Sequence, residues 1–418
     1  MAAILQTMTG QFVYTTLGGL CREVISVFIA FPFCRHKCSY CDLNAYAGLD
    51  DLIPAYVESL IVETRLIGRG ADAPVHTVYF GGGTPSLIPL PLLSDLFASL
   101  RDSFALTDDC EISLEANPDT VDAAYLKGLR QLGVNRLSLG AQSAQANELT
   151  LFGRTHTFDD VARAVKLARE AGFENISLDL IYGAPGQTME SWQDTMKRHL
   201  ALGVDHFSLY ALSLDFGTPL RAWVSRGLLP EPDSDLAAEM YEWADEELGR
   251  AGFTQYEISS WAKKEELQTS NSKLQNSKFE CRHNLQYWRN EPYLGLGAGA
   301  HGWCGGFRYS NAASPKAYVN RMKEGVERPF PFSPALAQSI PVNRETEMSE
   351  TMLTGLRLVS EGVSEESFRQ RYGSGLGDVF AKELGELSAR GLVEWTEDGA
   401  RLKKEGRLVA NWAFEKFV

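Results

Sequence analysis

The sequence contains no apolar run that approaches the ~20 residues needed to cross a lipid bilayer, so we expect no membrane span. It also lacks a basic N-terminal region followed by a long apolar stretch, and we therefore expect no signal peptide. Positive charge is in deficit, because 40 Lys and Arg stand against 54 Asp and Glu and give a net charge of −14. This balance argues against nucleic acid or an anionic membrane surface as the main partner.

Cysteine is sparse, with 7 in 418 residues, yet three of them, Cys34, Cys38 and Cys41, fall in one short loop. An odd count with three crowded together indicates a metal site and not a disulfide framework. It also indicates a reducing compartment, which we expect to be the cytoplasm. No fourth cysteine follows the loop, since position 43 is Leu43.

Three thiolates leave a metal centre incomplete. A structural zinc ion takes four ligands, and a [4Fe–4S] cluster held by protein alone takes four cysteines. A cluster bound by this loop would keep one iron open to an outside ligand. The other interpretation is a zinc site completed by His36 or by a remote cysteine, and the loop alone leaves both open.

β-rich and helical runs alternate after the first ~22 residues. The predicted strands cover residues 24–31, 75–80, 111–115, 136–141, 175–181 and 206–212, and the predicted helices between them begin near residues 53, 91, 119, 158 and 188. Strand–helix repeats of this kind build a parallel sheet with helices outside it. We therefore predict an α/β fold, a partial (β/α)6 TIM-like barrel with a C-terminal helical, winged-helix-like domain.

Polar residues and glycines follow these strands, at the edge where barrel enzymes carry their chemistry. The first strand runs into the cysteine loop, and the second runs into residues 81–85, which read GGGTP. The later strands end at or near Glu115, Gln142, Asp179 and Ser213. Three consecutive glycines let the backbone approach a ligand closely.

The chain divides into five predicted segments: an N-terminal segment (1–22), the barrel (23–262), a polar insertion (263–278), a connecting region (279–330) and the C-terminal domain (331–418). The insertion has little to bury, so we expect a mobile surface segment. In the last segment, helices predicted at 347–358 and 376–390 precede a hairpin signal at Asp398-Gly399. We expect this domain to cover the rim of the barrel.

The cysteine loop and the GGGTP run together resemble the radical SAM superfamily. The resemblance implies a [4Fe–4S] cluster whose open iron binds the amino and carboxylate groups of S-adenosylmethionine (SAM), while the protein fixes the geometry. It also implies the contacts of individual side chains with SAM: Tyr40 near the adenine, Gly82, Gly83 and Thr84 at the amino group, Glu115 at the ribose or ammonium, Gln142 at the ribose, Arg154 at the carboxylate and Asp179 at a ribose hydroxyl. Phe28 and Ser213 complete the set of candidate cofactor contacts.

Further runs, FPFC at 31–34, EANP at 115–118, LFGRTH at 151–156 and DLIYG at 179–183, extend the resemblance over nearly the whole chain. They are similar to the branch that contains oxygen-independent coproporphyrinogen III dehydrogenase and the HemW-type haem chaperones. Leu43 stands where the dehydrogenase has another cysteine, and the dehydrogenase has a longer N-terminal segment. Residues 283–288 read HNLQYW, which matches the chaperones' HNxxYW motif.

The resemblance therefore implies a protein that binds a cluster, SAM and haem and passes the haem to an acceptor protein, which the sequence does not name. Oxidative decarboxylation of coproporphyrinogen III is the alternative, and a zinc-stabilised binding module is a third. The motif implies His283 as the haem ligand, and imidazole can bind haem iron. Cys281 and His301 are weaker candidates. Two departures from the family pattern are Phe28 and Ala30, which stand where the family has Tyr and His. Since all three thiols remain, we expect cluster binding to persist.

Overall fold

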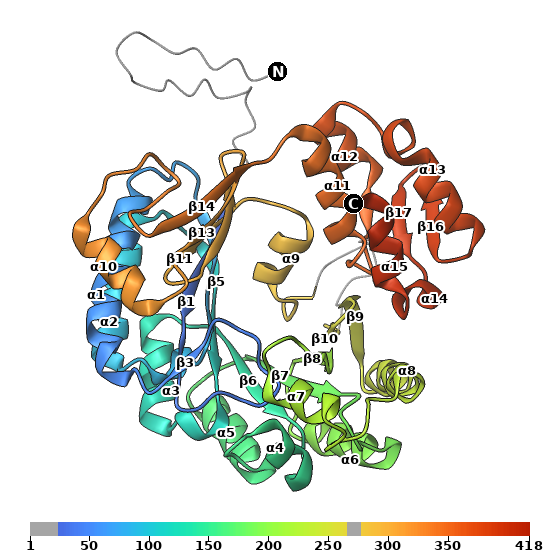
Figure 1. Ribbon diagram of the computed structural model, residues 1–418, viewed down its shortest axis with the longest axis horizontal. Helices are drawn as coiled ribbons and strands as arrows, with labels where there is room; N and C mark the ends of the chain where they lie inside the picture. The colour runs from blue at the N-terminus through green and yellow to red at the C-terminus, as the bar shows by residue number, and fades with distance from the viewer. Residues whose placement is uncertain (1–23, 266–276) are drawn as a thin grey trace.

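The computed structural model describes residues 24–265 and 277–418 (Figure 1). The expected N-terminal segment and most of the expected polar insertion lie outside the described residues. None of the helices within the described ranges is long and apolar enough to span a bilayer.

Six parallel strands form the centre of one large sheet (Figure 1). They are β1 (Ile25–Phe31), β4 (Val75–Gly82), β5 (Leu106–Ala116), β6 (Arg136–Gln142), β7 (Asn175–Tyr182) and β8 (His206–Ala211), and they lie side by side in this order. Each matches a strand expected from the sequence. The predicted α/β partial barrel is confirmed.

Helices cover the outer face of these strands: α1 (Ile53–Gly68), α2 (Leu90–Ser103), α3 (Ala123–Leu132), α5 (Phe158–Glu170), α6 (Met189–Leu200) and α8 (Ser234–Arg250). Two short helices, α4 (Ala146–Phe152) and α7 (Pro219–Ser225), lie against the loop that follows β1. α5 illustrates why the outer helices form. The Thr157 side chain caps its first turn by accepting a hydrogen bond from the Asp160 amide, and the Asp160 carboxylate accepts one from the Thr157 amide. Val161, Ala164 and Ala168 recur at helical spacing and are buried against the sheet.

The sheet continues beyond the six strands on both sides, which the sequence pattern did not indicate. β11 (Tyr293–Leu296) pairs in parallel with β1, and β12 (His301–Cys304), β13 (Phe307–Asn311) and β14 (Leu336–Pro341) follow in antiparallel order. At the other edge, β10 (Ser260–Lys263) and β9 (Phe253–Glu257) lie beside β8. Pairing between strands this far apart in sequence leaves no local signature.

The C-terminal part has its own core, built from residues between Met348 and Phe417. It contains α11 (Arg344–Gly355), α12 (Glu365–Tyr372), α13 (Leu376–Ala389), α14 (Lys404–Arg407), α15 (Ala410–Phe414) and a small sheet of β15 (Val363–Ser364), β17 (Gly399–Leu402) and β16 (Val393–Thr396). The expected hairpin is present as β16 and β17.

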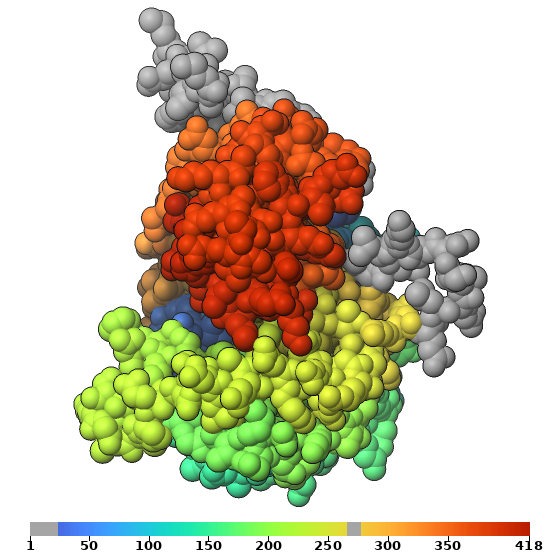
Figure 2. All heavy atoms as spheres, turned by 90° about the vertical axis from the view of Figure 1, so that its right-hand side faces the viewer, coloured from blue at the N-terminus to red at the C-terminus, as the bar shows by residue number. Residues whose placement is uncertain are grey.

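This C-terminal part does not cover the rim, contrary to the expectation from the sequence. It packs beside the edge strands instead, where the Ile258 amide donates to the Arg357 carbonyl and Arg407 donates to Gln255. Figure 2 shows it (red) directly over the yellow-green segment that contains α8 and β9. Its position is set by contacts that only the folded sheet provides.

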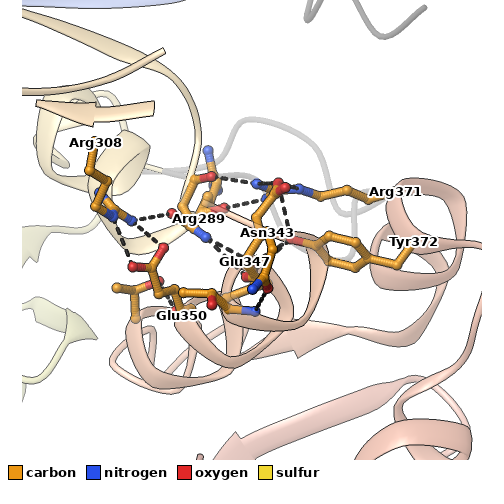
Figure 3. A network of polar contacts seen from close by, with 11 residues as sticks. Arg289, Arg308, Asn343, Glu347, Glu350, Arg371 and Tyr372 are labelled. Carbon is orange, nitrogen blue, oxygen red and sulfur yellow. Dashed lines mark hydrogen bonds and ion pairs between the residues drawn. The ribbon is translucent and has the colours of Figure 1, made fainter. Parts of the chain in front are cut away.

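A polar network joins it to the connecting region (Figure 3). Arg308 makes two hydrogen bonds to Glu350, at 2.9 and 2.7 Å. Arg371, which pairs with Glu347 inside the C-terminal part, donates to the Asn290 carbonyl at 2.8 Å. Arg308 also donates to the Asn290 side chain at 3.0 Å. Paired bonds from a planar guanidinium fix orientation as well as distance, so the network sets how α11 lies against the sheet.

Glu63 on α1 ties the barrel to the added strands. Its buried carboxylate accepts hydrogen bonds from Tyr318, Ser333, Asn311 and the Gly297 amide. All four donors belong to the connecting region and its flanks. A buried carboxylate bonded on both oxygens therefore connects residues far apart in the sequence.

Replacing Glu63 with alanine should destabilise the protein by roughly 3 kcal/mol or more, because it leaves four donors near the buried site without their acceptor. Urea denaturation followed by tryptophan fluorescence measures the change. Glu58→Ala, at an exposed position on the same helix, is the matched control and should stay within about 0.5 kcal/mol of the wild type. Equal effects of the two substitutions would contradict this account of Glu63.

Candidate cofactor site at the strand ends

A cavity of about 510 Å³ opens at the carboxyl ends of the parallel strands. Twelve of the expected site residues line it: Cys34, Cys38, Cys41, Tyr40, Gly82, Gly83, Thr84, Glu115, Gln142, Arg154, Asp179 and Ser213. They come from the ends of six strands and the loops that follow. The barrel therefore brings together side chains spread over 180 positions, counted from Cys34 to Ser213 inclusive.

The cysteine loop is held by main-chain contacts at its centre. The Ser39 amide donates to the Phe152 carbonyl at 3.0 Å, and the Leu220 amide donates to the Ser39 carbonyl at 2.9 Å. Tyr40 packs its ring edge-on against Phe152, with centroids 5.5 Å apart. The loop is thus fixed between the end of α4 and the start of α7.

The glycine run meets the start of this loop through backbone atoms. Gly82 has a φ of +109°, which favours glycine, and a Cβ on Gly83 would lie 2.6 Å from the Phe33 carbonyl oxygen. The amides of Gly82 and Gly83 already donate to Glu115 and to the Phe31 carbonyl. Any contact with an ammonium group would therefore use the carbonyl oxygens, which have the polarity to accept it.

Two of the three sulfurs accept hydrogen bonds from side chains across the cavity. Thr84 Oγ1 donates to Cys34 Sγ at 3.4 Å, and Arg154 Nη1 donates to Cys38 Sγ at 3.4 Å. Arg154 is held in turn by Asn117 and by the Gly140 carbonyl, at 2.6 and 2.7 Å. Hydrogen bonds to thiolate sulfurs are among the features that tune iron–sulfur clusters.

A bulge at the end of β6 directs Gln142 into the cavity. The pairing with β7 shifts between Gly140 and Gln142, and Gln142 has a φ of +65°. Left-handed backbone at a residue other than glycine is strained and often marks a functional position. A Cβ at Gly140 would lie 3.0 Å from the Arg154 guanidinium, so glycine there makes room for the arginine.

Glu115 and Asp179 place two carboxyl groups in the same cavity. Burial raises the pKa of Glu115 to about 7, with the charge of Asp179 adding to the effect. Burial likewise raises the pKa of Asp179, whose oxygens accept from Ser138 at 3.2 Å. Such carboxyl groups favour a cationic ligand, because a positive charge nearby stabilises their ionised forms.

Within the residues that the structure describes, no three His, Cys, Asp or Glu side chains are close enough together to hold a single metal ion. The three thiols line the same cavity but do not meet at one point, as the ligands of a mononuclear zinc site would. A four-iron cluster contacts each cysteine through a different iron. The donor set therefore fits a cluster.

Two of the expected site residues, Phe28 and His283, do not line this cavity. His283 lies on α9 (Arg282–Trp288) and is only 1% exposed. Its Nδ1 is 2.7 Å from Thr77 Oγ1 and its Nε2 is 2.9 Å from Tyr287 Oη, so both ring nitrogens have partners. Burial lowers the pKa of its imidazole to about 3, which keeps the ring neutral.

Phe28 lies between this cavity and a second one of about 370 Å³. The Phe28 ring stacks on Tyr79 at 6.2 Å, and Tyr79 donates a hydrogen bond to Glu115 in the first cavity. On its other side, Phe28 lines the second cavity together with Tyr287, Trp288 and Tyr293. Thr354 of α11 belongs to the second lining, so the C-terminal part contributes to that cavity and not to the first.

The reasoning from sequence missed several residues that shape the first cavity. Asn117 and the Gly140 carbonyl accept hydrogen bonds from Arg154, and the missing side chain at Gly140 leaves room for the guanidinium. Ser138 and Tyr210 line the first cavity. The EANP run, which contains Asn117, could have indicated that Asn117 belongs to the site. Ser138 and Tyr210 lie within strands, and no sequence motif marked them as site residues.

Comparison with known proteins agrees with this architecture. Residues 28–199 match the sequence model of the radical SAM superfamily, and residues 342–409 match that of the HemN C-terminal domain. The chain is 35% identical over 395 residues to the haem chaperone HemW of Bacillus subtilis, covering 94% of this chain and 99% of that one. This chain belongs to the HemW family of radical SAM proteins.

Other similar proteins include HemW of Mycobacterium tuberculosis, 35% identical over 93% of each chain. A mouse protein named radical S-adenosyl methionine domain-containing protein 1, mitochondrial, is also 35% identical, over 92% of this chain and 85% of its own. Among solved structures, coproporphyrinogen III oxidase (HemN) of Escherichia coli superposes with a TM-score of 0.78 at 23% identity, covering 94% of this chain and 90% of that one. That likeness shows the fold. Membership of the radical SAM superfamily implies a [4Fe–4S] cluster and SAM.

The raised pKa of Glu115 predicts a pH-dependent stability for this HemW family member in its cofactor-free form. A carboxyl group that keeps its proton up to about pH 7 in the folded state, but only to about 4.5 when unfolded, stabilises the fold at low pH. That contribution is lost as the pH rises through 7. The free energy of unfolding of Glu115→Gln, measured relative to that of the wild type, should therefore increase by on the order of 1–3 kcal/mol as the pH is raised from 5 to 8.

Denaturant unfolding at several pH values measures this difference, with the exposed Glu58→Gln as a control that should show none. A difference between Glu115→Gln and the wild type that does not change with pH would contradict the shifted pKa.

Proposed function

We propose that this protein is a haem chaperone that holds a [4Fe–4S] cluster and SAM in the first cavity, binds haem and transfers it to an acceptor protein. The observation that carries the proposal is the identity of about 35% to HemW proteins over nearly their full length. The two cavities on either side of Phe28 support it, since cofactor and cargo would each have a separate site. A cytoplasmic location is part of the same proposal.

In the first cavity, Cys34, Cys38 and Cys41 would hold the cluster. When bound, a reduced cluster and SAM supply one-electron cleavage of a carbon–sulfur bond. Thr84 and Arg154 would donate to the bound sulfurs, as they do to the thiols in the structure. The remaining contacts expected from the family, with Tyr40, Gly82, Gly83, Glu115, Gln142, Asp179 and Ser213, stay part of the proposal.

The second cavity has the surface that a porphyrin needs. Aromatic rings of Phe28, Tyr287, Trp288 and Tyr293 supply flat apolar faces. Ligand sites are typically concave and mainly apolar with a few polar groups, and this cavity fits that description. Ligation by His283 stays a prediction, and it would require the ring to release Thr77 or Tyr287.

Decarboxylation of coproporphyrinogen III is the competing function. The barrel motifs and the fold shared with HemN favour it, but at 23% identity the structural likeness extends to the fold alone. Leu43 lines the first cavity at the place where a fourth cysteine is expected in the dehydrogenase. We therefore expect no decarboxylated product when the protein is incubated anaerobically with coproporphyrinogen III, reductant and SAM.

Anaerobically reconstituted protein should contain one [4Fe–4S] cluster and should bind haem. Cys38→Ser should lose the cluster but keep haem binding, because the two cavities are separated by Phe28 and Tyr79. Iron and sulfide analysis, Mössbauer spectroscopy and a haem titration measure the two properties. Cys304→Ser, a partly buried cysteine outside the loop, is the control and should retain both.

A wild-type protein that binds no haem, or one that decarboxylates coproporphyrinogen III, would overturn the chaperone proposal. A reconstituted wild type without a cluster would overturn the assignment of the three thiols.

A further inference from the structure

Among the described residues, His301 is the one histidine that lines the second cavity. The chain has 7 histidines, and all lie within the described residues. His156, His199, His206 and His283 are buried. His36 belongs to the cysteine loop and the first cavity, and His76 bonds to Ser26 and Gln286. His301 is exposed and lines the second cavity.

The register of the sheet places His301 on the same face as Phe28. Phe28 pairs with Gly295 on β11, and Tyr293 pairs with Trp303 on antiparallel β12, so Gly295 lies opposite His301. The contact is close, since a Cβ on Gly295 would lie 1.9 Å from the His301 carbonyl oxygen. Side chains at paired positions project to the same face of a sheet.

Gly295 contributes no side chain between Phe28 and His301. Neighbouring strands are about 4.8 Å apart, so the backbones of β1 and β12 are separated by about 10 Å. Bare backbone therefore separates an aromatic ring on one strand from an imidazole on the other. Tyr287 and Trp288 reach the same cavity from α9.

We propose that His301 is the axial ligand that binds haem iron in the second cavity, where Phe28, Tyr287, Trp288 and Tyr293 contact the porphyrin. The proposal rests on the proposed function, since it requires that the chain carries haem. Histidine is a common axial ligand of haem iron. An exposed ligand at the rim also suits a carrier, because the iron must become accessible to an acceptor protein.

Other candidate ligands in this region are less suited. Both nitrogens of His283 already have partners. Burial raises the pKa of Tyr287 and of Tyr293, which disfavours binding of iron by a phenolate. Cys304 alternates with Trp303 along β12 and therefore projects to the opposite face. His301 requires no such rearrangement.

The test is a titration of the cluster-loaded full chain with ferric haem, followed by absorption and electron paramagnetic resonance spectroscopy. The wild type should show imidazole-ligated iron. His301→Ala should bind haem at least tenfold more weakly and lose that signature, and added free imidazole should restore the signature. His76→Ala, which removes a partly exposed imidazole outside both cavities, should behave like the wild type.

His301→Gln keeps a polar side chain of similar size and should show the same loss, which covers the case in which the alanine variant does not fold. Wild-type spectra from both His301 variants would overturn the inference while leaving the chaperone proposal standing. Loss of the signature in His283→Ala alone would assign the ligand to His283 and overturn it too. A wild type that binds no haem would overturn the proposed function, and this inference with it.

Discussion

The close contact between the ends of β1 and β4 is the constraint on which the first cavity depends. The Gly83 amide donates to the Phe31 carbonyl at 2.9 Å, and no side chain fits between Gly83 and the Phe33 backbone. This contact involves only main-chain atoms, so it places Cys34 beside Thr84 without competing for the side chains that face the cavity. The sulfurs, the glycine carbonyls and Glu115 then share one space because parallel strands end at the same edge.

An aromatic layer separates the chemistry of this cavity from the second one. Phe28 stacks with Tyr79, and Tyr79 stacks with His283 at 5.1 Å. Replacement of the family's tyrosine by Phe28 removes a hydroxyl from this layer, while the Tyr79 hydroxyl remains and is bonded to Glu115. The layer therefore presents a polar group toward the first cavity and apolar ring surface toward the second. This division is what the proposed function requires, since cofactor and cargo would occupy separate sites.

The C-terminal part forms part of the wall of the second cavity and does not line the first. Its Arg–Glu contacts are only partly buried, so each stabilises the protein by a small amount. Their paired geometry matters more, because it fixes α11 and with it Thr354 at the cavity wall. A shift of this part relative to the sheet would change the shape of the second cavity without moving the cysteine loop.

The sequence by itself determined the six parallel strands, the helices outside them and the residues at the strand ends. Those features are encoded locally, through apolar runs, capping residues and glycines at turns, so the cysteine loop, the glycine run and Glu115 could be assigned to one site from their order alone. Only the tertiary structure decided that β11 returns beside β1, that His283 is buried with both nitrogens bonded, and that His301 faces an aromatic cavity. These outcomes depend on pairing between strands 267 positions apart, counted from Ile29 to Leu296, and no local pattern of residues encodes such pairing.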